Sequence, residues 1–336
     1  MAALLDSDPG EALVRAEAIL RASPALPPVE LLACQALRRL GRAEAARARL
    51  SALARDHAHV PAVMWELAQA ASEAGAGRQA IAALESLTRQ QPSVSGGWFL
   101  LAKELRKAGR GAEAWRADLS GVHASGHDAE LLKAATAMHG GDLDGAEAIM
   151  GAKLLRQPDD PPALRLLGEI HWRRGDMTEA LERVERAVTL APGFDLAREF
   201  LIRLLTQTNR LAEALEHAET LAGSPVEIPG HDLIRASVLV RLGRQEEARA
   251  IYERLLAQHP EQPQVWQNLG HVLKTLGQQA EAVHAYRQAV QRLPTMGEAW
   301  WSLANLKTVK LGADDIAAME AALLSLEAVK EKRRED

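Results

Sequence analysis

The sequence predicts an all-α protein, a right-handed α-solenoid made of repeated helix pairs. The first indication is a 34-residue period, framed by prolines such as Pro229 to Pro260 and Pro263 to Pro294. The second is a composition of 47% hydrophobic but only 4% aromatic residues, which is typical of helices rich in Ala and Leu. No strand-like alternation competes with this pattern, and a fixed period of about 20–50 residues marks a repeat array.

The unit that starts at Pro263 shows what each position does. Gly270 and Ala282, at positions 8 and 20, are small where the first helix of the unit (helix A) crosses the second (helix B). Gly277, at position 15, is predicted to adopt the left-handed conformation that ends helix A. Pro294, at position 32, ends helix B because proline cannot continue a helix.

Large side chains complete the pattern, with Trp266 at position 4, Leu269 at 7, Tyr286 at 24 and Ala289 at 27. This resembles the tetratricopeptide repeat (TPR) signature W-x2-L-G, A-x3-F/Y, A, P. The resemblance implies stacked helix-turn-helix units that expose a concave surface to partner proteins.

Stepping along the chain by this period divides it into three parts. Residues 1–26 are interpreted as a lone helix B, and residues 27–296 as eight full repeats. The repeats are predicted to start at residues 27, 61, 95, 127, 161, 195, 229 and 263. Residues 297–336 are interpreted as a half-repeat, helix A over Gly297–Thr308, followed by a capping helix. The capping helix has one predicted apolar stripe, made of Ile316, Met319, Leu323 and Leu326.

The unit from Ser95 departs from the pattern. It has only 32 residues before His127, and Asp118 and Gly121 occupy positions 24 and 27, where apolar and small core residues are expected. We therefore predict a short or irregular helix B and a bend in the array at this unit.

Motifs for chemistry are absent from the sequence. It has no phosphate-binding loop, no dinucleotide-binding glycine pattern, no H-E-x-x-H and no C-x-x-C, and its 11 histidines are scattered. The one cysteine, Cys34, stands at the small position 8 and is given a packing role. We predict no catalytic residue, no cofactor and no metal site, and hence no enzyme activity of this chain.

Composition limits location and partners. A single cysteine fits a reducing compartment, and neither a signal peptide nor a membrane span is recognisable. The net charge of −5 is too mild to favour nucleic acid. We predict a soluble, cytoplasmic protein that binds neither nucleic acid nor membrane, and the sequence leaves its oligomeric state open.

The concave groove is the predicted functional surface. Positions 2, 5, 9, 12 and 13 of helix A point into it, since spacings of three and four return to one helical stripe. The cations at these positions are Arg38, Arg39, Lys103, Arg106, Lys107, Arg165, Arg173, Arg203, Arg241 and Lys274. The acids there are Glu73, Asp128, Glu169, Glu199 and Glu298. The groove is thus predicted to be basic, most sharply at Lys103–Lys107, and to bind an extended acidic peptide or protein segment.

Aromatic and amide side chains add predicted anchors in the groove: Trp65, Phe99, Trp172, Trp301 and Asn305. Chaperone-binding TPR proteins hold a C-terminal carboxylate with Lys at position 5 and Asn at position 9. Here only Asn305 fits position 9, and Trp301 stands at position 5 of that unit. A chaperone tail is therefore not the predicted partner.

The C-terminal segment carries a second resemblance. The stretches GEAWWSLANLKT, from Gly297, and DDIAAMEAAL, from Asp314, are similar to the TPR region of bacterial TPR-sulfotransferases. This resemblance implies a region that recruits substrate for a catalytic domain, yet the chain has no sulfonucleotide-binding loop. Two alternatives therefore stand beside the scaffold hypothesis: the recruiting region of such an enzyme, and an architectural array that self-associates.

Overall fold

The computed structural model describes residues 2–23, 26–224, 228–306 and 309–335, and every regular element in these ranges is an α-helix. The all-α prediction is confirmed. The chain forms two compact units, residues 1–201 and 202–336, which divide within α13 (Asp195–Gln207). None of the described helices is long and apolar enough to cross a membrane.

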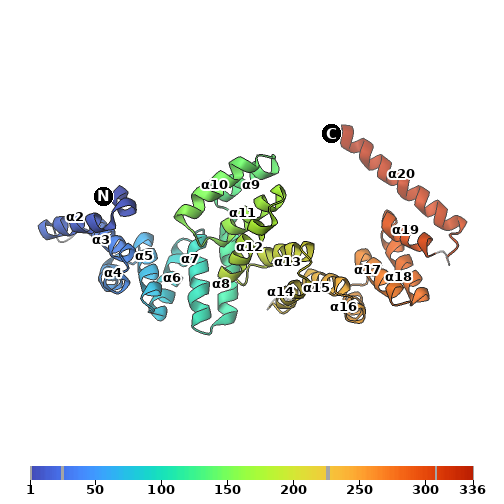
Figure 1. Ribbon diagram of the computed structural model, residues 1–336, viewed down its shortest axis with the longest axis horizontal. Helices are drawn as coiled ribbons and strands as arrows, with labels where there is room; N and C mark the ends of the chain where they lie inside the picture. The colour runs from blue at the N-terminus through green and yellow to red at the C-terminus, as the bar shows by residue number, and fades with distance from the viewer. Residues whose placement is uncertain (1, 24–25, 225–227, 307–308, 336) are drawn as a thin grey trace. The chain divides into compact units, whose positions relative to one another are not determined.

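Helices follow one another as A and B partners along the chain (Figure 1). The helices A are α3 (Pro27–Arg39), α5 (Pro61–Glu73), α7 (Ser95–Lys107), α9 (Ala129–His139), α11 (Pro161–Arg174), α13, α15 (Pro229–Arg241), α17 (Pro263–Thr275) and α19 (Gly297–Asn305). The helices B are α4 (Ala43–His57), α6 (Gly77–Gln90), α8 (Gly111–Ser125), α10 (Leu143–Arg156), α12 (Met177–Leu190), α14 (Leu211–Ala222), α16 (Gln245–Gln258) and α18 (Gln279–Arg292).

The two ends of the chain differ from the helix A and helix B pairs of the repeats. Where one helix is predicted before residue 27, the structure has two, α1 (Ala2–Ser7) and α2 (Pro9–Ala22). The last helix, α20 (Ala313–Glu335), begins 16 residues after Gly297, the same offset at which α18 follows Pro263. Ile316 and Leu323 of its predicted apolar stripe are 50% and 60% exposed, and the side chain of Leu326 lies outside the described residues.

The turn between helices A and B has the predicted backbone. Gly277 has φ +78°, and the glycine at position 15 of six other units also has positive φ. The one unit without glycine there has Asn209, with φ 60°. Asparagine tolerates this region because its short polar side chain bonds locally, so the turn is the same in all eight units.

Small residues allow the helices to cross, as predicted. A Cβ atom on Gly270 would lie 2.6 Å from Cε1 of Tyr286, which is fully buried in α18. On Gly168 of α11 it would lie 2.5 Å from a methyl group of Val184 in α12. These contacts leave no room for a larger side chain.

The prediction of a short or irregular helix at the Ser95 unit is wrong, because α8 runs without interruption over 15 residues. Gly121 is needed there, since a Cβ on it would lie 2.9 Å from the ring of Phe99. Asp118 is fully buried and accepts hydrogen bonds from Arg106 and from the backbone N–H of Gly193.

The apolar core does divide at this point. One cluster of buried residues extends from Cys34 to Ala117, and another from Leu131 to Ile170. The hydrogen bond from the Gly193 N–H to Asp118 therefore joins α8 directly to the loop after α12, although α9 to α12 lie between them in the chain. In a regular array each unit contacts only its neighbours, so the array is interrupted here.

Candidate partner-binding surface

The candidate site is the set of helix A side chains at positions 2, 5, 9, 12 and 13, which we call the A-helix surface. In residues 1–201 it belongs to α3, α5, α7, α9 and α11, and in residues 202–336 to the end of α13 and to α15, α17 and α19.

Arg38 of α3 is held by two carboxylates of α5. Its Nε donates to Glu66 at 3.1 Å and its Nη1 donates to Glu73 at 2.7 Å. Gln35 also donates to Glu66, which is only 6% exposed. Arg38 is therefore engaged between two neighbouring helices A and does not present a free positive charge. Arg39, the next residue, is exposed.

The predicted basic cluster on α7 is largely neutralised. Arg106 donates to Asp118 at 2.6 Å and to the carbonyl oxygen of Leu190 at 2.9 Å. Lys107 donates to Glu104, which also accepts from Ser72 and is 2% exposed. Lys103 is exposed and makes no ion pair with any described residue.

The expectation of a strongly basic stretch at Lys103–Lys107 is thus corrected. Counting charges only at the five surface positions leaves out Glu66, Glu104 and Asp118, which lie at positions 6, 10 and 24. Their carboxylates are buried beneath the cations and pair with them. A charge count limited to the five surface positions could not include these buried carboxylates, and so it overestimated the positive charge.

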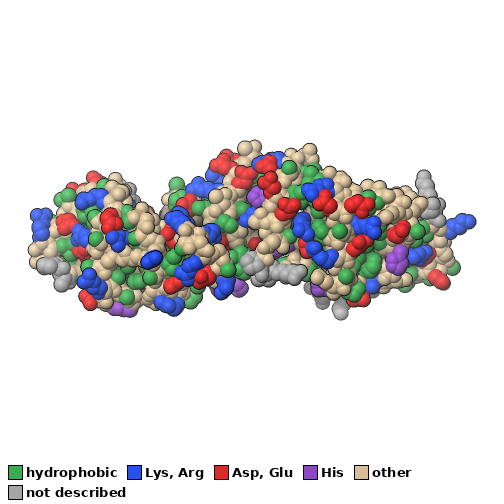
Figure 2. Space-filling view, turned by 90° about the horizontal axis from the view of Figure 1, so that it is seen from below, with side chains coloured by type: hydrophobic (Ala, Val, Ile, Leu, Met, Phe, Trp, Pro, Cys, Tyr) green, Lys and Arg blue, Asp and Glu red, His purple; other side chains and the backbone are tan. Residues whose placement is uncertain are grey.

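On α11, Arg165 and Arg173 share one carboxylate. Both donate to Glu169, at 3.3 and 3.1 Å. In residues 202–336, Arg203 and Arg241 are exposed, and Arg241 donates to the carbonyl oxygen of Thr206 at 3.4 Å. Figure 2 shows Lys and Arg side chains interspersed with Asp and Glu on the face it draws, without one large patch of either sign.

The predicted aromatic anchors differ in exposure. Phe99 is 6% exposed and belongs to the core, so its prediction as a groove anchor is wrong. Trp65 is half-buried against the apolar cluster of α3 to α8. Trp172 is half-buried with its ring edge-on to Phe200, 5.8 Å between centroids. Trp301 alone among the four is widely exposed, at 63%.

Trp301 lies on α19, the helix A that follows α17. His271 Nε2 of α17 is 3.7 Å from a carboxylate oxygen of Glu298 at the start of α19, so the two helices A approach each other here. Lys274 of α17 and Asn305 of α19 are both exposed. This part of the A-helix surface combines an aromatic ring, an ammonium group and an amide on adjacent helices.

His271 was not singled out from the sequence. Its Nδ1 is 2.9 Å from the hydroxyl of Tyr286, a geometry that fits a hydroxyl donating to a neutral imidazole. Burial raises the pKa of Tyr286 to about 12, because it disfavours the charged phenolate. Burial lowers the pKa of His271, because it disfavours the charged imidazolium. The imidazole is therefore neutral near pH 7, and the positive charge of this region comes from Lys274.

Chemistry by metal or thiol finds no support in the part of the chain that the structure describes. No group of three or more His, Cys, Asp or Glu side chains there could hold a metal ion. Cys34 is fully buried, and burial raises the pKa of its thiol to about 12. A thiol with that pKa stays protonated and is unreactive, in keeping with a packing role.

One protein-family model matches part of the chain. Residues 146–295 match the family model described as tetratricopeptide repeat. This stretch includes α11 to α18.

Two curated relatives share parts of the sequence. TTL3 of Arabidopsis thaliana, described as an inactive TPR repeat-containing thioredoxin, is 34% identical over 92 residues, 27% of this chain and 13% of the relative. EccA3 of Mycolicibacterium smegmatis, described as an ESX-3 secretion system protein, is 30% identical over 149 residues, 42% of this chain and 24% of the relative. The chain thus spans less than a quarter of the length of either protein.

Among solved structures, pilF of Pseudomonas aeruginosa matches 62% of this chain and 97% of its own, with 16% identity and a TM-score of 0.48. YrrB, described as a TPR protein with an unusual peptide-binding site, matches 56% of this chain and 97% of its own, with 16% identity and a TM-score of 0.46. At this level of likeness no functional inference follows from either.

Proposed function

We propose that this chain is a non-catalytic scaffold that binds an extended, acidic segment of a partner protein on the A-helix surface of α17 and α19. Arrays of helical repeats commonly bind partners through extended surfaces of this kind. The proposal rests on the wide exposure of Trp301 on α19 and the exposure of Lys274 on α17, two helices that approach each other at His271 and Glu298.

The chemistry of these side chains favours one class of segment. Tryptophan is the residue most often found at the energetic centre of interfaces, where a large ring is covered by an apolar group of the partner. Lys274 attracts a carboxylate, and the Asn305 amide can both donate and accept hydrogen bonds with a peptide backbone. An acidic segment that also carries an apolar side chain can contact Trp301, Lys274 and Asn305 together.

Arg203 extends the proposal to the end of α13 within residues 202–336, because it is exposed on this surface. In residues 1–201, Arg39 and Lys103 are the exposed cations of the A-helix surface. Arg38, Arg106, Lys107, Arg165 and Arg173 are proposed to act indirectly, by fixing neighbouring side chains through their ion pairs. Arg241 of α15 would border the segment within residues 202–336.

A peptide-display selection on the full chain tests the proposal. We expect selected peptides to be enriched in Asp and Glu, and to bind the Trp301→Ala and Lys274→Glu variants at least about tenfold more weakly, a loss typical of interface anchors. Raised salt should weaken binding of the wild type.

Two matched control variants change similar side chains outside the proposed site. Leu324→Ala removes another exposed apolar side chain, and Lys133→Glu reverses the charge of another exposed lysine. Neither should change peptide affinity. If Trp301→Ala and Lys274→Glu bind as the wild type does, or the selected peptides are not acidic, the proposal is wrong.

The two alternatives rest on the sequence. Recruitment for a sulfotransferase depends on the resemblance at Gly297–Thr308 and Asp314–Leu323, and a sulfonucleotide-binding domain encoded after residue 336 would support it. Self-association requires a second copy, so light scattering that reports a monomer at high concentration would exclude it.

A further inference from the structure

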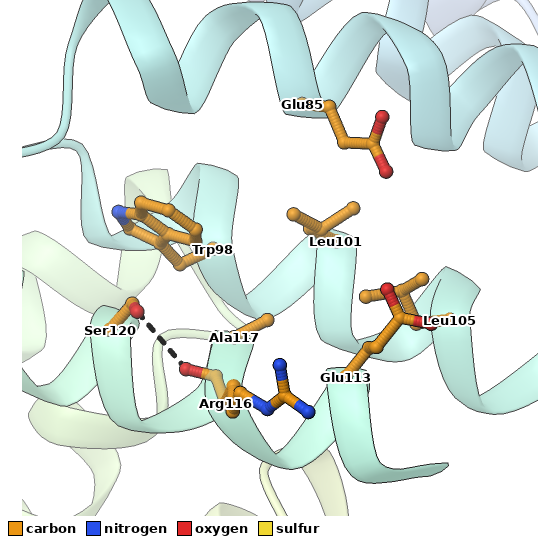
Figure 3. Close-up of a pocket in the computed structure, with 8 residues that line it drawn as sticks. All are labelled: Glu85, Trp98, Leu101, Leu105, Glu113, Arg116, Ala117 and Ser120. Carbon is orange, nitrogen blue, oxygen red and sulfur yellow. Dashed lines mark hydrogen bonds between the residues drawn. The ribbon is translucent and has the colours of Figure 1, made fainter. Parts of the chain in front are cut away.

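A pocket of about 180 Å³ lies among α6, α7 and α8, away from the A-helix surface (Figure 3). Trp98 forms one wall, and Leu101 and Leu105 line the apolar part. Glu85 of α6 and Glu113 of α8 bring carboxylates to it. A space of this size accommodates a group as large as a benzene ring.

The chain contains two other tryptophans in the same setting as Trp98. Trp98, Trp266 and Trp300 each stand at position 4, and each indole N–H donates to the carbonyl oxygen of a proline six residues earlier. Trp300 is 8% exposed. The three rings are therefore oriented alike by the same local bond, and they differ in what covers them.

In the Pro263 unit, side chains of the same unit cover the ring. The guanidinium carbon of Arg292 lies 5.4 Å from the centroid of Trp266, and His284 meets that ring edge-on at 6.0 Å. Arg292 also pairs with the carboxylate of Glu261 at 3.4 Å. A tryptophan, a guanidinium and a carboxylate thus form one stack.

The Ser95 unit lacks the covering arginine. The residue equivalent to Arg292 is Ala124, and the residue equivalent to Gln288 beside it is Ser120, which lines the pocket. Arg116, at the position of His284, makes no cation–π contact with Trp98 in the described structure. The ring of Trp98 consequently faces the open pocket, whereas the ring of Trp266 faces the guanidinium of Arg292.

We propose that this pocket binds an arginine side chain presented by a partner protein. The guanidinium would stack on Trp98 and pair with Glu85 and Glu113, while the aliphatic stem would lie on Leu101 and Leu105. Glu85 is the carboxylate with room for such a guest, because its ion pair with Arg110 is long, 3.7 Å. Glu113 is engaged more tightly by Arg110, at 2.6 Å.

This site is separate from the proposed acidic-peptide surface, and it takes a ligand of opposite charge. Neither proposal depends on the other, so the failure of one leaves the other standing.

The test uses the full chain and a blocked tripeptide, acetyl-Gly-Arg-Gly-amide, followed by the NMR signal of the Trp98 indole N–H. A peptide with citrulline in place of arginine keeps the shape and removes the charge. We expect saturable binding of the arginine peptide in the millimolar range, and binding of the citrulline peptide at least about fivefold weaker, because the cation–π and ionic contacts are lost.

Variants of the chain separate the contributions. Glu85→Gln should weaken binding about fivefold or more, and Arg116→Gln should strengthen it by removing a like charge beside the guest. Ser120→Arg should abolish binding, because the new guanidinium would occupy the pocket. Arginine is tolerated at this repeat position, where Arg186 and Arg254 stand in other units.

Ser86→Arg is the matched control. It adds the same charge at the same repeat position of the preceding unit, in which Met64 replaces the tryptophan, and it should leave binding unchanged. Equal binding of the arginine and citrulline peptides, no shift of the Trp98 signal up to about 10 mM peptide, or unaltered binding by Ser120→Arg would each overturn the proposal.

Discussion

Single residues determine how closely the helices of a unit approach. Gly270 and Gly168 stand where the side chains of Tyr286 and Val184 leave less than 3 Å for a Cβ atom. Asn209 performs the same backbone task as seven glycines at position 15, because it too tolerates positive φ. These requirements are local and steric, and so they are visible in the sequence as a periodic pattern of small residues.

Substitution of Gly270 by Ala tests the packing at this crossing. We expect a loss of about 1–3 kcal/mol in the free energy of unfolding, because the added methyl group overlaps the buried ring of Tyr286. Gly151→Ala is the matched control, since no atom lies within 4 Å of the new Cβ. It should stabilise α10 by up to about 1 kcal/mol through helix propensity. Hydrogen exchange of α17, α18 and α10 measures both changes, and equal effects of the two variants would contradict the prediction.

At the scale of elements, buried charges join helices that the repeat pattern treats as separate. Lys153 of α10 is 4% exposed and lies 2.7 Å from Asp128 and 3.5 Å from Asp160. These carboxylates also accept backbone N–H bonds at the starts of α9 and α11. One ammonium group therefore connects two helix caps across three helices.

The buried Asp118 joins α8 to the loop after α12. Asp118→Ala should destabilise this junction by about 1–3 kcal/mol, because the buried N–H of Gly193 loses its acceptor. Asp118→Asn should restore most of the loss, since the amide oxygen can still accept. Hydrogen exchange of α8 is the readout. Glu113→Ala on the same helix breaks only an exposed pair with Arg110 and should have little effect.

The pH dependence of stability provides an independent check on Asp118. Burial raises the pKa of its carboxyl group above the ordinary 3.8, against the opposing effects of Arg106 and the Gly193 N–H. The folded protein then holds this proton more tightly than the unfolded chain does. The contribution of Asp118 to the free energy of unfolding must therefore decrease as pH rises from 3.8 through the folded pKa, and stay constant above it.

Urea unfolding from about pH 3 to pH 7 should show this decrease in the wild type relative to Asp118→Asn, which has no proton to lose at this position. The other carboxyl groups are common to both proteins and cancel in the comparison. Parallel stability curves for the two proteins would show that the carboxyl group of Asp118 is not perturbed.

At the scale of the whole molecule, stability is expected to sum over units that contact mainly their neighbours. Gly168 and Gly270 lie in different compact units of the chain. The loss of unfolding free energy in the double variant Gly168→Ala/Gly270→Ala should equal the sum of the single losses within about 0.5 kcal/mol. Urea unfolding of the four proteins measures this, and a larger discrepancy would mean that the two units are energetically coupled.

The candidate sites show where prediction from the sequence stops. Trp301, Lys274 and Asn305 were placed on the A-helix surface by periodicity, and the structure leaves them exposed. Phe99 occupies the same repeat position as Trp301 yet is buried, because Gly121 opens space for its ring. The periodicity predicts Arg106 as part of a basic stretch, but the carboxylate of Asp118, twelve residues later, neutralises it.

The sequence by itself determined the all-α repeat, the 34-residue period, the left-handed turn at position 15 and the small residues at the crossings. Each of these depends on interactions within one unit or between immediate neighbours, which recur at fixed spacing. Only the tertiary structure decided which charges pair, that α8 reaches the loop after α12, and that Trp98 faces an open pocket. Those features depend on contacts among side chains of several helices, and a periodic sequence pattern does not indicate such contacts.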